Sequence, residues 1–351
     1  MIRRIRLLVV MARPAVLLML CVFANTGFAQ AGGSHRLPLA QALAAVVGFL
    51  LFSVAVNDLA DEAIDRVNLP ADRSRPLVAG TGYRREMATI AVASGAVALA
   101  ASVPLGWPAV GVLAAGLALS AGYSVRPVRL ADRGAVASML LPACYVAVPY
   151  LVGLLAARPS VHRAGPLVHR ADVVLLAGLY LGFIGRILLK DFRDVRGDAL
   201  FGKRTFLVRH GRRPTCALSG GCWVAGSVVL LAGLRPAAPA LVAGYAVAAA
   251  GALWLLRELA GNPGPRREER LVSAIAIVGR GQLLALLAQL SMRQAGWPAL
   301  AAAAVIAALA AIVAGQARAM LHYGPVTPRV VLPECSAVPA VQGTKPKEEL
   351  P

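Results

Sequence analysis

Two groups of acidic residues in this chain repeat one spacing. The first group consists of Asp58, Asp61 and Asp65, directly preceded by Asn57. The second consists of Asp191, Asp194 and Asp198, directly preceded by Lys190. In both groups the carboxylates stand at positions i, i+3 and i+7, which places them on one face of an α-helix. Because the offset between the groups is the same at all three positions, we predict two similar helical units that face one site.

Three carboxylates on one helical face repel one another, so positive partners must stabilise them. Salt bridges to nearby arginines would do this, and so would divalent cations. Two groups in register favour the cations, because Mg²⁺ prefers carboxylate oxygens and leaves coordination positions for phosphate oxygens. Basic residues also lie close to both groups, among them Arg66, Arg75 and Lys190. Such cations bind a diphosphate directly.

The elements that must position these groups are apolar helices. The chain has 351 residues, of which 58% are hydrophobic and only 15% charged, whereas soluble domains carry about 25% charged residues. Many apolar runs approach or exceed the roughly 20 residues that cross a bilayer as a helix. The runs lie over residues 7–31, 38–60, 87–104, 107–123, 135–157, 172–189, 214–234, 239–257, 271–292 and 297–320. This pattern excludes a soluble enzyme, a disordered protein and a disulfide scaffold, and it predicts an all-α polytopic membrane protein.

The net charge of +19 is distributed unevenly between the two faces of that membrane protein. Most of the arginines and lysines lie at the N-terminus and in the loops after the second, fourth, sixth and eighth spans, which share one face. Because cytoplasmic loops carry an excess of basic residues, we expect this face in the cytoplasm. Both acidic groups lie on it, which predicts an integral protein of the plasma membrane with its site facing the cytoplasm. Basic residues in short loops between spans do not indicate a nucleic-acid partner.

The two ends of the chain differ from the rest. Three arginines precede the first apolar run, which ends in small residues as a cleavable signal peptide would. Arg13-Pro14 interrupts that run and many spans follow it, so we expect the run to remain as an anchor. Residues 1–322 are expected to form a single transmembrane domain. The proline-rich residues 323–351 are expected to be disordered.

In its motifs the chain resembles the UbiA family of intramembrane prenyltransferases. The family motif NDxxDxxxD is matched by the first acidic group and DxxDxxxD by the second. Further agreement is found at Arg75-Pro76-Leu77, at Gly202-Lys203-Arg204-Thr205 and at Tyr123-Ser124 in the third cytoplasmic loop. The resemblance extends over about residues 8–290. One departure is Val125-Arg126-Pro127, which stands where two prolines and a lysine often follow the Tyr-Ser pair.

The resemblance implies about nine transmembrane helices around a central cavity, or ten if residues 297–320 add a span. It implies a prenyltransferase in which the aspartates hold two Mg²⁺ ions and the ions bind the diphosphate of a polyprenyl donor. The prenyl group would pass to an aromatic or lipid-like acceptor. The expected partners are therefore a polyprenyl diphosphate, a hydrophobic acceptor and the lipid bilayer. The second motif resembles members that act on lipid or chlorin-type acceptors.

These implications assign roles to particular residues. The principal metal ligands, and the catalytic residues, are expected to be Asp58, Asp61, Asp191 and Asp194. Asp65 and Asp198 are expected to complete the metal shell. The residues expected to bind substrate are Asn57, Arg13, Arg66, Arg75, Tyr123, Arg126 and Lys190. Arg186 either faces the same cavity or pairs with an acidic neighbour. Arg13 stands inside the first predicted span, where an unpaired arginine is costly.

Two other functions use similar residues. A membrane-embedded terpene cyclase would have the same metal site and the same donor but no acceptor. An anion transporter would also have repeats and charges within the membrane. Six aspartates facing an anion argue against the transporter unless metal ions intervene. The detection of a hydrocarbon from the donor alone, or of transport without a product, would separate these functions from prenyl transfer.

Overall fold

The structure is a computed structural model that describes residues 2–68, 75–158, 166–192, 205–234 and 237–325. These residues form helices and connecting loops, with no strand among them. The longer helices are α1 (Ile2–Met11), α2 (Pro14–Gln30), α3 (Arg36–Asn68), α4 (Arg84–Ser102), α5 (Trp107–Ser124), α6 (Ala135–Pro142), α7 (Val148–Ala157), α8 (Arg170–Leu188), α11 (Arg212–Gly233), α12 (Pro239–Ala260), α13 (Pro265–Gln294) and α14 (Ala299–Tyr323). Shorter helical segments are η1 (Val103–Leu105), η2 (Leu130–Asp132), η3 (Ala143–Ala147) and α10 (Phe206–His210). From residue 326 onward, the expected tail lies outside the described residues.

Within the described chain, nine helical segments are long and apolar enough to cross a membrane, and α2 adds a shorter apolar helix. In this count α4 continues through η1, and α6, η3 and α7 form one segment. An all-α integral membrane protein is therefore confirmed. The helices α13 and α14 are separate and pack against each other, so the apolar run at 297–320 is an additional helix rather than a piece of the one before it.

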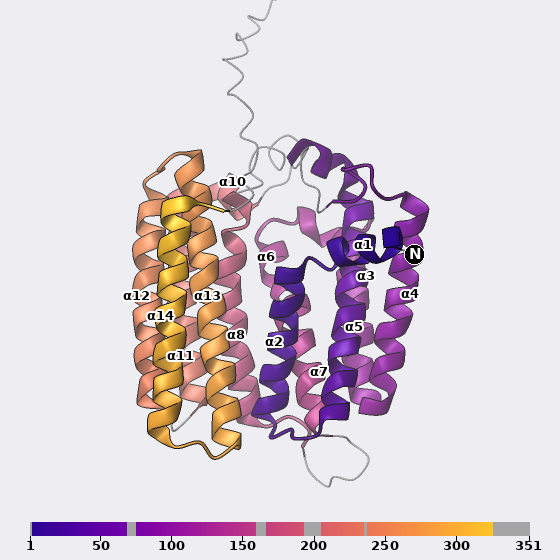
Figure 1. Cartoon of the computed structure of the whole chain (residues 1–351). Coiled ribbons are helices and arrows are strands. Elements are labelled where there is room, and N and C mark those ends of the chain that lie inside the picture. The colour runs from indigo at the N-terminus through magenta and orange to yellow at the C-terminus, as the bar shows by residue number, and fades with distance from the viewer. Residues whose placement is uncertain (1, 69–74, 159–165, 193–204, 235–236, 326–351) are drawn as a thin grey trace, which may run out of the picture.

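The helices form two groups that stand side by side (Figure 1). One group contains α2, α3, α4, α5 and α7, and the other contains α8, α11, α12, α13 and α14. Each group contains a closely packed helix pair, α3 with α4 and α8 with α11. In each pair the first helix is the one that leads into an acidic motif. This arrangement agrees with the two similar helical units predicted from the repeated spacing.

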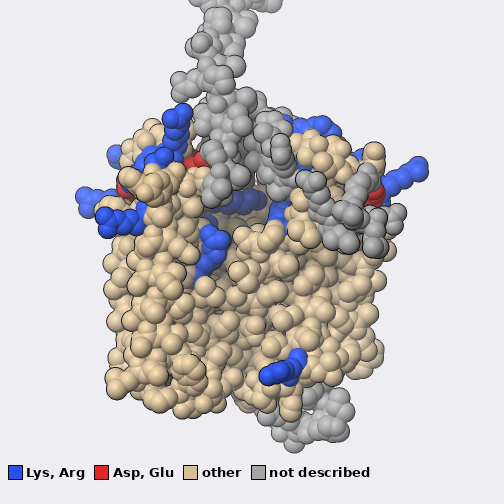
Figure 2. Space-filling model, viewed as in Figure 1, with Lys and Arg blue, Asp and Glu red and all other residues tan. Residues whose placement is uncertain are grey.

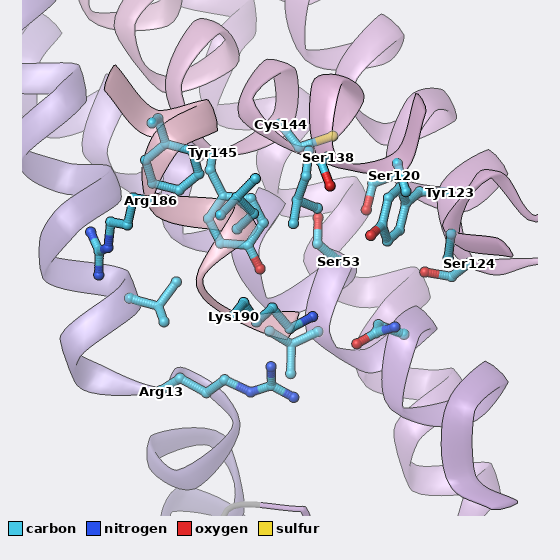
Figure 3. Close-up of a pocket in the computed structure, with 18 of the residues that line it drawn as sticks. Arg13, Ser53, Ser120, Tyr123, Ser124, Ser138, Cys144, Tyr145, Arg186 and Lys190 are labelled. Atoms are coloured by element: carbon cyan, nitrogen blue, oxygen red, sulfur yellow. The ribbon is translucent and has the colours of Figure 1, made fainter. Parts of the chain in front are cut away.

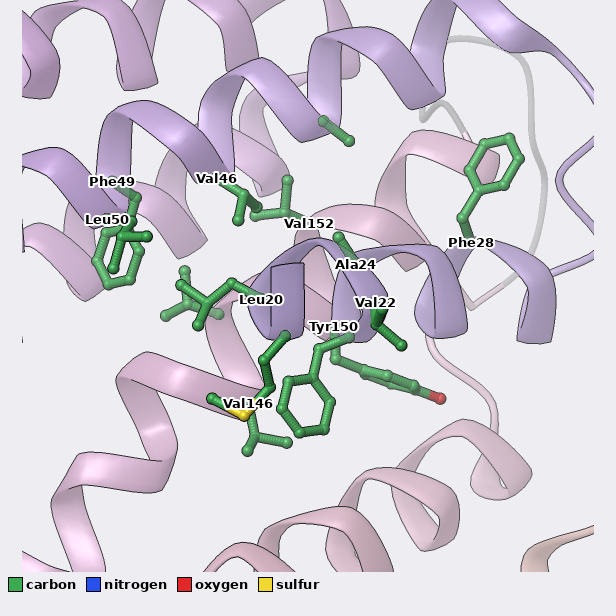
Figure 4. Close-up of a cluster of buried hydrophobic side chains, with 14 of the residues drawn as sticks. Leu20, Val22, Ala24, Phe28, Val46, Phe49, Leu50, Val146, Tyr150 and Val152 are labelled. Atoms are coloured by element: carbon green, nitrogen blue, oxygen red, sulfur yellow. The ribbon is translucent and has the colours of Figure 1, made fainter. Parts of the chain in front are cut away.

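Small residues allow the helices of each group to approach closely. A Cβ atom at Gly153 of α7 would stand 1.8 Å from the carbonyl oxygen of Ala24, and one at Gly27 of α2 would stand 2.0 Å from that of Tyr150. Membrane helices commonly associate through such residues, because lipid supplies no hydrophobic drive for association. Around this contact, Leu20 and Val46 belong to a buried apolar cluster (Figure 4). The close packing fixes α2 beside α3 and α7.

The first apolar run is two helices rather than the one predicted over residues 7–31. The helix α1 ends at Met11 and α2 begins at Pro14, because proline lacks an N–H group and disfavours a helical conformation in the residue before it. Arg13 between them has a φ of 45°, in the left-handed region. In Figure 1, α1 lies across the end of the helix group rather than along it. Arg13 is therefore at a junction near the end of the bundle, and not inside a span as the sequence suggested.

A buried ion pair lies at the opposite end of the bundle from the acidic motifs. Arg158 follows α7 and Asp172 is in the first turn of α8, and their side chains approach to 2.5 Å with only 8% and 1% exposed. Asp172 also accepts a hydrogen bond from the backbone N–H of His169 at 2.8 Å, and the Tyr150 hydroxyl donates to the Asp172 carbonyl at 3.2 Å. A buried pair that is hydrogen-bonded in this way joins the two helix groups at this end.

Candidate active site

The first acidic motif lies on the last turns of a single uninterrupted helix. At about 1.5 Å per residue, the 33 residues of α3 are about 50 Å long, which exceeds the roughly 30 Å hydrocarbon thickness of a bilayer. The helix therefore carries the motif to the end of the membrane-spanning region without a break. Asp58, Asp61 and Asp65 are 2%, 9% and 7% exposed. The predicted common face of the first motif is confirmed by this shared burial.

Two arginines from distant parts of the chain meet Asp58. The Arg13 guanidinium donates to Asp58 Oδ1 at 2.6 Å, and Arg75 donates to the same oxygen. Arg75 also lies 3.1 Å from a carboxylate oxygen of Asp65. Both arginines therefore offset the repulsion between the motif's carboxylates. The sequence allowed either salt bridges or divalent cations as the positive partners of these carboxylates, and the structure contains the salt bridges.

A third arginine meets Asp61, and the sequence gave no role to it. Arg129 donates to Asp61 Oδ1 at 2.6 Å, while the Asn57 side-chain amide donates to Asp61 Oδ2 at 2.7 Å. Arg129 also contacts Asp132 at 2.9 Å. Its position three residues after Arg126, in the loop that follows Tyr123-Ser124, was the only signal in the sequence. The departure from the family loop lysine therefore has a candidate replacement in Arg129.

The second motif begins where its helix ends. The helix α8 stops at Leu188, Leu189 and Lys190 form a turn, and the chain is helical again at Asp191 and Phe192. Lys190 and Asp191 both line the cavity described below. Asp194 and Asp198 lie outside the described residues, so their roles as metal ligands remain predictions.

A cavity of about 410 Å³ lies between the two helix groups and contains most of the predicted site. The predicted residues that line it are Arg13, Asn57, Asp61, Arg75, Tyr123, Lys190 and Asp191. Asp58 and Asp65 are buried in the ion pairs beside it. Figure 3 shows Arg13 and Lys190 close together in the pocket, although they come from different helix groups. The lining also includes the hydroxyl group of Ser124, from the Tyr123-Ser124 pair, and three that the sequence did not single out, at Ser53, Ser120 and Ser138.

The apolar part of the cavity lies deeper in the bundle than the charged part. Two turns before Asn57 on α3, the lining residues are Phe49 and Leu50. On α2, Met19 and Leu20 stand between one and two turns beyond Arg13. Because these helices run side by side, their charged residues gather at one end of the cavity and their apolar residues at the other. Such a cavity suits a ligand with an anionic head and an apolar body.

Two of the predicted substrate-binding residues do not line this cavity. Arg66 is an exposed partner of Glu62, at 2.9 Å. Arg126 is exposed and lines a separate surface hollow. Arg186 does line the main cavity, where its guanidinium donates to Met19 Sδ at 2.7 Å and lies 5.8 Å from the centre of the Phe183 ring. Arg186 therefore faces the cavity, which is one of the two positions that the sequence allowed for it.

The surface charge follows the same division as the cavity. Figure 2 shows lysines and arginines gathered at the motif end of the molecule, around a hollow, while the flank below is nearly free of charge on the face in view. An uncharged flank suits contact with lipid acyl chains. The charged end suits the membrane surface and the water beyond it.

The first motif has the chemistry of a magnesium site. Carboxylate and amide oxygens are hard ligands of the kind that Mg²⁺ prefers. The Oδ2 atom of Asp58 is buried and has no hydrogen-bond partner among the described residues, so a bound cation would satisfy it. Among these residues no three acidic, histidine or cysteine side chains converge on one point, and half of the predicted ligand set is in the second motif. The first motif fits half of a metal centre, in which arginines now neutralise the carboxylates.

Comparison with known proteins gives one family match. The model of the UbiA prenyltransferase family matches residues 17–274. The match begins in α2 and ends in α13, and it includes both acidic motifs.

Sequence relatives cover a smaller part of the chain. The bacteriochlorophyll synthase 34 kDa chain of Chloroflexus aurantiacus is 28% identical over 162 residues, which are 46% of this chain and 48% of the relative. The bacteriochlorophyll synthase 33 kDa chain of Rhodobacter capsulatus is 30% identical over 182 residues, which are 50% and 55% of the two chains. The chain thus spans about half the length of the curated relatives it matches.

Solved structures share the fold over most of the chain. A structure described as digeranylgeranylglyceryl phosphate synthase has a TM-score of 0.61 at 16% identity and covers 82% of this chain and 98% of its own. A UbiA homologue from Aeropyrum pernix has a TM-score of 0.59 at 20% identity, with coverages of 76% and 96%. A UbiA homologue from Archaeoglobus fulgidus bound to GPP and Mg²⁺ has a TM-score of 0.57 at 15% identity, with coverages of 80% and 99%. At these identities the likeness establishes a common fold.

Proposed function

The chain belongs to the UbiA prenyltransferase family, and from this premise we propose that it transfers a prenyl group from a prenyl diphosphate to an apolar acceptor with Mg²⁺ as its cofactor. The observation that carries the proposal is the cavity, with its charged end at the acidic motifs and its apolar end deeper in the bundle. A prenyl diphosphate has the matching shape, a compact anion joined to a hydrocarbon chain. A related structure from Archaeoglobus fulgidus is described as bound to GPP and Mg²⁺.

The charged residues at the cavity end would bind the diphosphate and stabilise its departure. Arg13, Arg75 and Lys190 line the cavity and carry positive charge toward the place where negative charge develops on the leaving group, and fixed charges of this kind lower the barrier. Arg129 would act from beside the cavity, through its ion pair with Asp61. Asp58, Asp61 and Asp191, with Asp65, Asp194 and Asp198, would hold the metal. Bound Mg²⁺ supplies Lewis-acid neutralisation of the phosphate oxygens.

The arginines that pair with the aspartates have a second consequence for binding. Before ligand binds, Arg13 and Arg75 share the Asp58 carboxylate. A cation that takes over this carboxylate would free both guanidinium groups for the diphosphate oxygens. Donor and metal would therefore bind together more tightly than either binds alone.

The apolar wall would protect the reaction from water. Phe49, Leu50 and Leu20 surround the part of the cavity below the charged end. An allylic cation formed there would meet the acceptor before it meets water, because a closed apolar site excludes side reactions. The bacteriochlorophyll synthase names of the sequence relatives support a chlorin-type acceptor.

The experiment is a product analysis with purified protein in nanodiscs. Geranyl diphosphate and pheophorbide a, a chlorin with a free carboxylic acid, are supplied with Mg²⁺, and the products are identified by mass spectrometry. We expect a prenylated chlorin that disappears with EDTA and returns with added Mg²⁺. Full activity without any divalent cation would contradict the metal site. A hydrocarbon formed from the donor alone, with no prenylated chlorin, would establish a terpene cyclase instead.

We also propose that the motif end faces the cytoplasm, in the plasma membrane. The arginine-rich loops at that end support this orientation. In a cysteine-free background, Thr81→Cys near the motif end and Ser34→Cys at the opposite end give matched exposed positions. In intact cells an impermeant maleimide should label only the second variant. Labelling of the first variant alone would reverse the orientation.

A further inference from the structure

A second, smaller cavity of about 70 Å³ adjoins the main one. The two cavities share Phe183 and Arg186. The small cavity lies among α2, α8, α11, α12 and α13, and it has room for a group of a few heavy atoms. Glycines form much of its wall, at positions Gly178, Gly182, Gly226 and Gly279. Because glycine has no side chain, the few polar groups that line this cavity are accessible to whatever fills it.

The first of these polar groups is the indole N–H of Trp223. The side chain is 3% exposed, and Nε1 has no hydrogen-bond acceptor among the described residues. The ring atom Cδ1 would stand 2.6 Å from a Cβ at Gly185, and Cη2 would stand 3.1 Å from a Cβ at Gly279. Since Nε1 lies between these atoms on the ring edge, the N–H group faces the space between α8 and α13.

The second polar group is the side-chain amide of Gln282, on α13 near Gly279. Its nitrogen is also buried without a hydrogen-bond partner in the part of the chain that the structure describes. The Tyr245 hydroxyl donates to the Gln282 carbonyl at 3.0 Å, which holds the backbone of α13 against α12. Buried polar groups are nearly always paired in native proteins. Two unpaired donors in one cavity therefore indicate a ligand that accepts hydrogen bonds.

The charge around this cavity is positive. Arg186 forms part of its wall. Charged residues within membrane helices usually serve a function, and Arg186 favours an electron-rich oxygen in this cavity.

We propose that the small cavity binds a carbonyl oxygen of the chlorin-type acceptor, while the carboxylate that receives the prenyl group stays in the main cavity. This inference rests on the proposed function. The prenyl donor cannot satisfy these donors, because all its oxygens belong to the diphosphate and its remaining body is hydrocarbon. An acceptor held through Trp223, Gln282 and Arg186 would present its ring to the main cavity across Phe183. The small cavity thus selects the acceptor, while the motif end binds the donor.

The test measures binding rather than turnover. Pheophorbide a and its methyl ester are titrated into nanodisc protein without donor, and the chlorin fluorescence reports the dissociation constant. Trp223→Phe and Gln282→Met keep the bulk of each side chain and remove the N–H groups. Each variant should weaken binding about fivefold, the scale of one hydrogen bond. Trp254→Phe, which makes the same change at a side chain 59% exposed on α12, should bind as the wild type does.

The two ligands distinguish the kind of oxygen. A ring carbonyl is common to the acid and the ester, so both should bind each variant more weakly. A loss of affinity for the acid alone would place the carboxylate in the small cavity, away from the donor, and would overturn the inference. Affinity for geranyl diphosphate should be unchanged in both variants. Wild-type affinity in folded Trp223→Phe and Gln282→Met would overturn the inference and leave a water-filled cavity, as would failure of the wild type to bind either chlorin. If the variants weaken binding but the wild type transfers no prenyl group, only the proposed function fails.

Discussion

Asp61 and Glu62 are adjacent in sequence, and their surroundings predict opposite effects on activity. Asp61 lines the cavity, accepts a hydrogen bond from Asn57 and pairs with Arg129 at 2.6 Å. Glu62 points about 100° away around the helix and pairs instead with Arg66 and Arg84. The matched substitutions Asp61→Asn and Glu62→Gln each remove one negative charge with little change of size.

The expected magnitudes follow from burial. Asp61 is 9% exposed, and breaking a buried ion pair by removing one partner costs about 3–5 kcal/mol. If this loss falls on the diphosphate and metal site, activity should drop at least about a hundredfold, which is roughly 2.7 kcal/mol of barrier. The side chains of the arginines that meet Glu62 are 56% and 64% exposed, and exposed pairs contribute only about 0.2–1 kcal/mol each. Glu62→Gln should therefore keep activity within about threefold of wild type.

The assay is the initial rate of prenyl transfer with saturating Mg²⁺, compared among proteins that elute as one peak and remain folded at the assay temperature. A second measurement, the Mg²⁺ concentration for half-maximal activity, should rise for Asp61→Asn and stay constant for Glu62→Gln. Equal losses in both well-folded variants would refute the one-faced helix and the site built on it. A normal Mg²⁺ requirement in Asp61→Asn would remove Asp61 from the metal shell.

Three further predictions follow from the ion pairs. Asp58→Ala and Asp191→Ala should each reduce turnover to the level of a no-enzyme control, since each removes a ligand from one motif; near-normal rates in either would show that one motif suffices. Arg129→Ala should lower kcat/KM at least about tenfold, the scale of 1.4 kcal/mol, whereas Arg126→Ala should change kcat/KM less than about threefold. The reverse order in the same rate assay would show that Arg126, and not Arg129, replaces the lysine of the family's loop. Arg158→Met leaves a buried carboxylate unpaired and should destabilise the protein by about 3–5 kcal/mol, seen as a lower thermal midpoint in detergent; an unchanged midpoint would mean that this pair adds no net stability.

The first acidic motif could be predicted in detail because its geometry is local. The helical repeat alone places Asp58, Asp61 and Asp65 on one face, and their burial agrees with it. The same reasoning located the apolar helices, since their length and composition are properties of continuous segments. The second motif was less predictable in shape, because α8 ends at Leu188, before its first aspartate.

The arginine partners could not be predicted from local spacing. Arg66 follows Glu62 by one helical turn and pairs with it. This local pair explains why Arg66 does not line the cavity, although it lies close to the motif in sequence. Arg13 and Arg129, in contrast, reach Asp58 and Asp61 from other helices and loops. Which cation meets which carboxylate depends on how α2 packs beside α3 and on the path of the loop after α5. The sequence therefore determined which residues line one face of each helix, because that depends on the helical period, whereas only the packing of separate helices decided which faces meet.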